Sequence, residues 1–154
     1  GDPERITVAG NSSGGAIAAV VHQRAVALRI PIRSAALFQP FLCPTAGMGV
    51  GEAADAGEVD YSSRLEFGDC ASLPSRALEW WVQAYIKKNG CNEICKMHDI
   101  GRDPRCTPVK GTLTHDLAPV VVVTGSADML RDEGFEYFKA LSDSGVEAYH
   151  ASKK

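Results

Sequence analysis

A run of four valines at positions 120–123 is the feature that most constrains the fold of this 154-residue chain. The run lies in PVVVVTGS (119–126), which has the length of a strand and no polar face. A strand that is apolar on both faces is typical of the centre of a parallel sheet covered by helices. The valines therefore predict a central parallel strand that is buried on both faces.

Three other segments have the pattern of strands. RITVA (5–9) and SAALFQPF (34–41) are short apolar runs, and VEAYHAS (146–152) alternates between apolar and polar residues. Together with the valine run they predict a sheet of at least four strands.

Two segments between these strands predict helices. Residues 16–28 are apolar almost all round, which favours a buried helix over a surface one. In 131–145, Phe135, Phe138 and Leu141 recur at helical spacing, and acidic residues occupy the first turn. The order of strands and helices predicts an α/β fold in which a mostly parallel sheet is flanked by helices.

Residues 43–110 differ in composition and sequence pattern from the segments on either side. Their first part is rich in glycine and alanine and predicts a loop, whereas SLPSRALEWWVQAYIKKNG (72–90) predicts a helix. We therefore expect a core made of 1–42 and 111–154, interrupted by an insertion at 43–110.

Two adjacent tryptophans lie in the helix expected within the insertion. Trp81 shares an apolar stripe with Leu78, Val82 and Tyr85, so we expect it to pack inside the insertion. Trp80 lies off that stripe and faces another side of the helix. It fits either a contact with a ligand pocket beneath the insertion or partial burial against a neighbouring loop.

The turn Gly10-Asn11-Ser12-Ser13-Gly14 fits the pattern G-x-S-x-G, with Ser12 in the middle. In a nucleophile elbow this pattern turns a strand sharply into a helix, and the strained serine needs small residues two positions away on each side. The hydroxyl then stands at the carboxyl edge of the sheet, where the helix N-terminus favours negative charge. The backbone N–H of Ser13 would supply one donor of an oxyanion hole.

The same turn also fits a phosphate-binding loop or a plain turn, because glycine and serine are common in loops. The strand expected before it and the apolar helix expected after it favour the elbow. Ser13 fits the position of the nucleophile less well than Ser12, because the residues two positions from Ser13 are Asn11 and Gly15.

A serine nucleophile needs a base, and the base needs an acid that orients it. Asp128 follows the valine strand, at the edge where open parallel sheets bind ligands. It fits the acid, and it fits equally well a simple cap of the next helix. Asp132 and Glu133 have the pattern of ordinary acidic residues in the first turn of a helix.

The chain resembles the hormone-sensitive-lipase-like carboxylesterases, a bacterial and plant branch of the α/β-hydrolase fold. The resemblance rests on GDPERITVAGNSSGG (1–15) and LAPVVVVTGSADMLRDEG (117–134). That family typically reads GDP-x-R-I-x-V-x-GDSAGG and D-x-L-R-D-E-G in these places. The resemblance implies that Ser12 is the nucleophile, that Asp128 is the acid, and that the insertion after Phe41 is part of a cap over the acyl pocket.

The chain also departs from the family pattern. Asn11 stands where the family has an acid, Ser13 stands where it has alanine, and the insertion is unusually rich in cysteine. The resemblance makes RCTPVKGTLTHDL (105–117) the return from the cap to the sheet. These departures leave the elbow pattern intact, but they leave the substrate preference open.

The third member of a catalytic triad is not evident among the four histidines, which are His22, His98, His115 and His150. The family places its histidine in a loop after the last expected strand, and it places an H-G-G-G-type oxyanion loop before the nucleophile. Both positions fall outside the 154 residues. We therefore expect the chain to be the C-terminal part of a hydrolase domain, which the remaining segments would complete.

Five cysteines lie at the entrance of the insertion or within it, namely Cys43, Cys70, Cys91, Cys95 and Cys106. Their density favours two disulfides in the cap, with Cys43 left over, and hence a secreted or lumenal protein. Buried thiols in a cytoplasmic protein are an alternative. Zinc bound by Cys91, Cys95, Cys106 and His98 is another, although the spacing matches no recognised zinc motif.

Composition limits the partners. The net charge is −3, and lysine and arginine are scattered, so the sequence gives no footprint for nucleic acid. No apolar run has the roughly 18 residues that a membrane-spanning helix needs. The expected partner is a small ester, without a cofactor, and a homodimer is left open.

Two functions from different classes remain. The first is a serine esterase that cleaves short to medium acyl esters through an acyl-enzyme. The second is a non-catalytic ligand-binding or assembly protein on the same fold, since plant gibberellin receptors resemble this family and lack the histidine. The presence of both Ser12 and Asp128 favours the enzyme.

Overall fold

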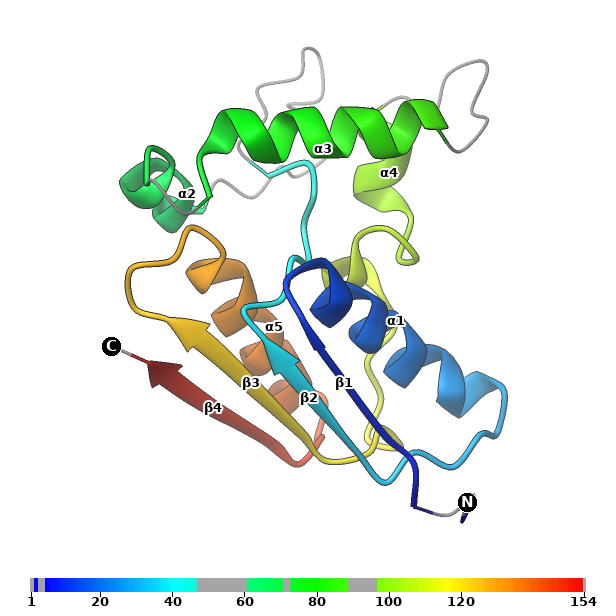
Figure 1. Cartoon of the computed structure of the whole chain (residues 1–154). Coiled ribbons are helices and arrows are strands. Elements are labelled where there is room, and N and C mark those ends of the chain that lie inside the picture. Colours follow the sequence, from blue (N-terminus) through cyan, green and yellow to red (C-terminus); the bar gives the residue numbers. More distant parts are fainter. Residues whose placement is uncertain (1, 3–4, 47–60, 71–72, 89–96, 154) are drawn as a thin grey trace.

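The computed structural model describes residues 2, 5–46, 61–70, 73–88 and 97–153. Its centre is a parallel sheet with the strand order β1-β2-β3-β4. The strands are β1 (Thr7–Asn11), β2 (Ser34–Phe38), β3 (Val120–Gly125) and β4 (Ala148–Lys153). Helix α1 (Ser13–Ala27) connects β1 to β2, and helix α5 (Arg131–Asp143) connects β3 to β4. The four expected strands and both expected helices are present, although β1 runs on to Asn11 (Figure 1).

Helices α1 and α5 pack on the same side of the sheet (Figure 1). Register places Ala35 beside Val120, and Leu37 beside Val122, so these four side chains share one face. They form the main core with alanines of α1 and with Tyr137 and Leu141 of α5. The core therefore lies in a single layer between the sheet and the two helices.

The prediction that the valine strand is buried on both faces is wrong. Val120 and Val122 are buried, but Val121 and Val123 on the other face are only partly so. The neighbours of Val121 and Val123 on that face include Tyr149 and Phe38, which are 59% and 42% exposed. The physical reason is that α1 and α5 pack on the other side of the sheet, over Val120 and Val122.

Helix α1 is likewise not buried all round, contrary to the prediction. Its buried face consists mainly of small residues such as Ala18 and Ala19, which let the helix approach the sheet closely. Ile17 and Val21 point the other way and are 65% and 42% exposed. An apolar sequence therefore produced a helix with one packed face and one exposed face.

In its described residues the insertion contributes three helices beyond the carboxyl ends of the strands (Figure 1). They are α2 (Ser62–Phe67), α3 (Ser75–Lys88) and α4 (Met97–Arg102), and a 3-10 turn follows at Pro108–Lys110. Only α3 was predicted. Most of the glycine-rich part expected to be a loop, 47–60, lies outside the described residues.

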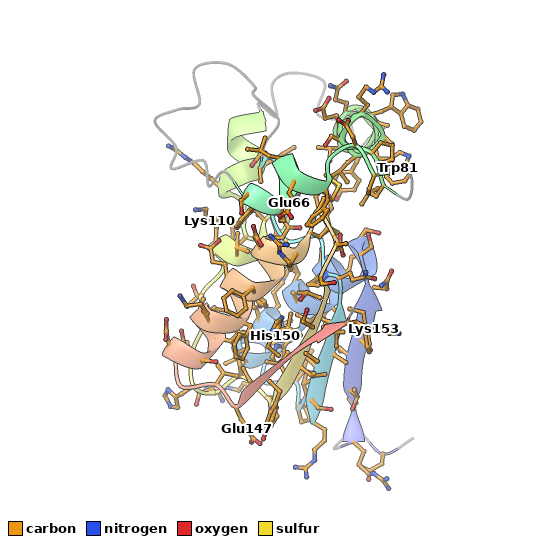
Figure 2. All side chains as sticks on the ribbon, turned by 90° about the vertical axis from the view of Figure 1, so that its left-hand side faces the viewer. Glu66, Trp81, Lys110, Glu147, His150 and Lys153 are labelled. Atoms are coloured by element: carbon orange, nitrogen blue, oxygen red, sulfur yellow. The ribbon has the colours of Figure 1, made fainter. Side chains whose placement is uncertain are left out.

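Helix α3 contacts the core through part of its apolar stripe. Leu78 is buried in a cluster with Met129 and Leu130, which follow β3. The expectation that Trp81 packs inside the insertion is wrong, because its side chain is 53% exposed (Figure 2). Trp80 is 65% exposed. The stripe contacts the core along one edge only, so the residues at its other edge remain open to solvent.

His22 is a buried polar residue of the main core. It is 1% exposed, and its Nε2 lies 3.0 Å from the carbonyl oxygen of Ala118, just before β3. A neutral imidazole can donate that hydrogen bond, whereas a charged ring would have to be buried. Burial therefore lowers the pKa of His22.

We expect this histidine to make the protein sensitive to acid. Because the pKa is lower in the folded than in the unfolded state, the unfolded state binds more protons below about pH 6.5. The free energy of unfolding should thus fall on acidification from pH 6.5, by at most about 1.4 kcal/mol per pH unit from this group. Urea unfolding between pH 5 and 7 measures the slope, and His22→Gln should flatten it. Equal slopes in the two proteins would contradict the assignment.

Candidate active site

The turn between β1 and α1 holds Ser12 in an unusual backbone conformation. Ser12 has φ 53° and ψ −120°, a left-handed conformation that is costly for a residue with a Cβ atom. Its N–H donates to the carbonyl oxygen of Phe38 at 2.9 Å. Its own carbonyl accepts from the N–H groups of Ala16 and Phe41, each at 3.1 Å. The strained residue is therefore held from both sides of its peptide backbone.

The two glycines of the G-x-S-x-G pattern have different surroundings. A Cβ atom on Gly10 would overlap the carbonyl group of Gly14, so this position accepts only glycine. A Cβ atom on Gly14 would meet no atom within 4 Å. The expectation that the residues two positions from Ser12 must be small holds for Gly10 and fails for Gly14.

A third glycine of the turn, Gly15, has a packing role that sequence reasoning missed. A Cβ atom at Gly15 would lie 2.9 Å from Cβ of Pro40, in the turn after β2. Gly134, in the first turn of α5, approaches the same proline, and a Cβ atom there would lie 3.7 Å from Cδ of Pro40 and 2.8 Å from Cγ2 of Thr124. The starts of α1 and α5 therefore both pack closely around Pro40.

Asp128 lies three residues beyond the end of β3, at the same edge of the sheet as Ser12. Its Oδ1 accepts the backbone N–H of Leu130 at 2.9 Å, so the carboxylate also stabilises the turn into α5. The expected cap of the next helix is not formed as such, because the N-cap of α5 is Leu130, which makes no side-chain cap hydrogen bond. The hydrogen bond with Leu130 uses Oδ1 and leaves Oδ2 of Asp128 for other contacts.

Gln39 lies between the two candidate residues and was not found by sequence reasoning. It has φ 42°, and its Oε1 accepts from Nδ2 of Asn11 at 3.4 Å. A Cβ atom on Gly125 would lie 3.2 Å from Nε2 of Gln39 and 3.7 Å from Oδ2 of Asp128. Asn11 and Gln39 thus connect the turn at Ser12 with the turn after β2, and Gln39 and Asp128 both approach Gly125.

Glu133 has a role very different from that expected for a first-turn acid. It is 0% exposed and forms an ion pair with Arg64 of α2 at 3.0 Å. Its two oxygens also accept the N–H groups of Leu42 at 3.3 Å and Cys43 at 3.2 Å. Burial raises the pKa of Glu133 to about 7, and Arg64 together with the two N–H groups opposes that shift. No local sequence pattern signals this pair, because its members are 69 positions apart.

Helix α2 is also attached to the segment that follows Asp128. Oδ2 of Asp132 accepts from Oγ of Ser62 and from the N–H of Ser63, both at 2.8 Å. Oγ of Ser63 donates to the carbonyl oxygen of Met129 at 2.9 Å. Helix α2 of the insertion therefore rests directly on the turn that carries the candidate acid.

The histidines that the structure describes with their side chains have other partners. His22 is bonded to Ala118, and His115 lies on the surface with its Nε2 3.3 Å from Oδ1 of Asp116. His150 is 3.0 Å from Oγ1 of Thr124 and stacks on Phe138 (Figure 2).

The cysteine predictions depend on residues that the structure does not describe. Cys91 and Cys95 fall outside the described ranges, so the disulfides, the buried thiols and the zinc site stay predictions. Within those ranges Cys43 is buried, and no group of three or more His, Cys, Asp or Glu residues could hold a metal ion. Across the same part of the chain no helix combines the length and hydropathy needed to span a membrane.

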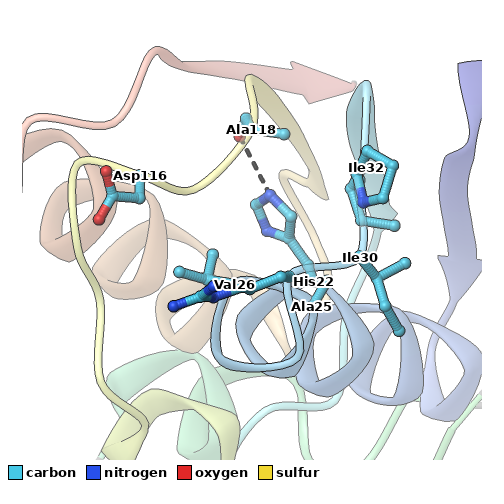
Figure 3. A pocket seen from close by; sticks show the side chains of 9 residues that line it. His22, Ala25, Val26, Ile30, Ile32, Asp116 and Ala118 are labelled. Atoms are coloured by element: carbon cyan, nitrogen blue, oxygen red, sulfur yellow. Dashed lines mark hydrogen bonds between the residues drawn. The ribbon is translucent and has the colours of Figure 1, made fainter. Parts of the chain in front are cut away.

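A cavity of about 450 Å³ lies at the opposite edge of the sheet from Ser12. It is bounded by the last turns of α1, by the segment leading into β2, and by the loop before β3. Its lining includes His22, Arg29, Ile32, Asp116 and Ala118 (Figure 3). Because parallel sheets bind ligands at the carboxyl ends of their strands, this cavity is not where the candidate residues act.

Comparison with known proteins gives consistent matches. A family model described as alpha/beta hydrolase fold matches residues 1–153. A carboxylic ester hydrolase, LipN of Mycobacterium tuberculosis, is 29% identical over 144 residues, which are 94% of this chain and 34% of that protein. An ethyl acetate hydrolase of Pseudomonas putida is 25% identical over 94% of this chain and 39% of its own length.

Solved structures match over the same extent. A hyperthermophilic esterase of Pyrobaculum calidifontis superposes with a TM-score of 0.78 at 26% identity, covering 99% of this chain and 44% of that one. The chain thus spans between a third and a half of the length of these relatives.

The two glycines beside Ser12 should respond differently to substitution. Gly10→Ala should lower the free energy of unfolding by about 3 kcal/mol, because its Cβ would overlap backbone atoms that cannot move aside. Gly14→Ala should leave stability unchanged or raise it by up to about 1 kcal/mol, because alanine favours the helix. Urea unfolding of both variants tests this pair, and equal losses would contradict the geometry of the turn.

Proposed function

The chain belongs to the alpha/beta hydrolase fold family, and from that membership we propose that it forms part of a serine hydrolase that cleaves carboxylic esters. The observation that carries the proposal is the backbone of Ser12, whose φ of 53° and ψ of −120° place it at a sharp turn from strand to helix. Such strain is tolerated where it serves a function. The esterases among the relatives support ester hydrolysis as the reaction.

In the proposed reaction Ser12 is the nucleophile. Its Oγ attacks the carbonyl carbon of the ester while a histidine takes the hydroxyl proton. The tetrahedral intermediate then collapses, the C–O bond to the alcohol breaks, and the alcohol leaves with that proton. Water attacks the resulting acyl-enzyme in the same way, which releases the carboxylic acid and restores Ser12.

Ser13, the first residue of α1, is the proposed donor of the oxyanion hole. The N–H of Ser13 opens α1, where backbone N–H groups have no acceptor within the helix. We propose that it donates to the oxyanion that develops next to Ser12. Gly10 supports this arrangement by letting the backbone of Gly14 approach the strand. Gly14 itself is the proposed second glycine of the elbow.

Asp128 is the proposed acid that orients the histidine. It lies at the carboxyl edge of the sheet, and its Oδ1 is fixed by the N–H of Leu130. The histidines described with their side chains are engaged elsewhere, so we propose that the base comes from the part of the relatives' length that this chain does not span. The same holds for the second oxyanion donor.

The insertion 43–110 is the proposed cap over a core formed by 1–42 and 111–154. Helices α2, α3 and α4 lie beyond the edge of the sheet that carries Ser12 (Figure 1). Trp80 and Trp81 are exposed on α3 and are the proposed aromatic contacts for the acyl chain. Short to medium acyl esters are the proposed substrates, because a cap limits the length of the acyl chain.

An activated serine can be detected by its reaction with a fluorophosphonate probe. We expect the full-length protein to be labelled at Ser12, with mass spectrometry of the peptides locating the adduct. Ser12→Ala should abolish the labelling. Ser13→Ala should retain it, because that change keeps the backbone N–H.

The labelling has two contrary outcomes. Labelling at Ser13 would move the nucleophile by one residue. A folded full-length protein that is not labelled at all would leave the non-catalytic binding role on this fold.

The role of Asp128 can be separated from its role in the turn. Asp128→Asn keeps an oxygen that accepts the N–H of Leu130, so the turn should be preserved. It removes the charge that stabilises the histidine, so kcat should fall by about 10⁴-fold. Hydrolysis of p-nitrophenyl butyrate by the full-length protein measures this, with Asp116→Asn on the surface as the matched control. A folded Asp128→Asn protein that keeps kcat within tenfold of the wild type would contradict the assignment.

A further inference from the structure

Glu133 is a fully buried charged residue that the proposed reaction does not use. Its carboxylate receives an ion pair from Arg64 at 3.0 Å and two backbone hydrogen bonds from Leu42 and Cys43. A charge without access to water is stable in a protein only when it is paired and hydrogen-bonded in this way. The contacts of Glu133 therefore join α5 to α2 and to the turn after β2.

The hydrogen bonds from Leu42 and Cys43 connect Glu133 with the turn that holds Ser12. Leu42 and Cys43 belong to the turn that follows β2, and the end of β2 together with this turn binds the backbone of Ser12 on both sides. The carbonyl of Phe38 accepts the N–H of Ser12, and the N–H of Phe41 donates to the carbonyl of Ser12. Phe41 is followed directly by Leu42, so the carboxylate of Glu133 fixes the end of the turn that holds the nucleophile.

The start of α5 connects Glu133 with Asp128. Glu133 lies in the first turn of α5, and the backbone just before it is closed by hydrogen bonds from Arg131 to the carbonyl of Asp128 and from Gly134 to that of Leu130. The side chain of Asp128 binds the N–H of Leu130 in the same segment. Hydrogen bonds therefore fix the backbone between the candidate acid and Glu133.

Arg64 closes the arrangement from the insertion. Its Nη2 donates to Glu133 and also to the carbonyl of Cys43 at 3.2 Å. Its side chain is 5% exposed, and its guanidinium lies over the ring of Phe41 at 5.3 Å from the ring centre. The guanidinium thus contacts both the carboxylate and the turn that the carboxylate binds.

We propose that Glu133 is a positioning residue for ester hydrolysis. Its carboxylate joins the turn that holds Ser12 to the helix that follows Asp128, and Arg64 of the insertion keeps the carboxylate in place. This inference rests on the proposed function, because it concerns the relative placement of the proposed nucleophile and acid. It also makes the attachment of the insertion at α2 a condition for an aligned site.

The test is Glu133→Gln in the full-length protein. Glutamine has the same shape, but it has one carbonyl oxygen for the two N–H groups and no charge for Arg64. We expect kcat for p-nitrophenyl butyrate to fall by about ten-fold or more, because small misplacements of reacting groups slow catalysis strongly. KM should stay within about two-fold, and the rate of fluorophosphonate labelling at Ser12 should fall in parallel with kcat.

Glu136→Gln is the matched control. Glu136 lies in the same helix and accepts the hydroxyl of Tyr61 at 2.6 Å, so it also joins α5 to the residue that precedes α2. Among the described residues it forms no hydrogen bond or ion pair with the turn at 38–43. The Glu136→Gln protein should keep kcat within about two-fold of the wild type.

The outcomes separate this inference from the proposed function. A wild-type protein that is not labelled at Ser12 overturns the proposed function itself. A labelled wild type with equal kcat and labelling rate in folded Glu133→Gln overturns only the positioning role, as does a change confined to KM.

If Glu133→Gln does not fold, Arg64→Lys provides the test, because lysine keeps the positive charge but has a shorter side chain that reaches Glu133 less well. A kcat lowered by about three-fold or more at unchanged KM supports the positioning role, and an unchanged kcat overturns it.

Discussion

The chain must pass from strand β1 into helix α1 at one residue, and the rest of the site is arranged around that constraint. Ser12 adopts a left-handed backbone that costs free energy, so neighbouring groups have to hold it there. The carbonyl of Phe38 and the N–H of Phe41 do so through hydrogen bonds. The tightness of the turn also explains Gly10, where any side chain would collide with the backbone of the helix.

The turn after β2 is where these requirements meet. Pro40 is buried between the starts of α1 and α5, which approach it at Gly15 and Gly134. The end of the same turn is bound by Glu133. A short segment without regular secondary structure thus links the two helices that follow the candidate nucleophile and acid. Its own sequence gives little indication of this, since its partners come from distant parts of the chain.

Local patterns in the sequence were sufficient for the strands, for the helices beside them and for the positions of Ser12 and Asp128. Each depends on residues close together, such as the valine run or the G-x-S-x-G turn. Burial was predicted less well, because whether Val121 or Ile17 is covered depends on which side of the sheet the helices occupy. The Arg64–Glu133 pair and the contacts of Gln39 could not be predicted, because they join segments far apart in the sequence.

The sheet consists of two strand–helix–strand units, β1-α1-β2 and β3-α5-β4, joined by the parallel pairing of β2 with β3. The whole insertion lies within that single connection. The entropy of closing a loop grows only with the logarithm of its length, about 0.6 kcal/mol for each doubling. Changes in the length of the insertion therefore add little to the entropic cost of closing this connection, provided that the contacts of α2 are kept. They do separate the two units further along the chain, which slows the search for the central pairing during folding. Such a fold can diversify its insertion over evolution while each unit keeps its own sequence constraints.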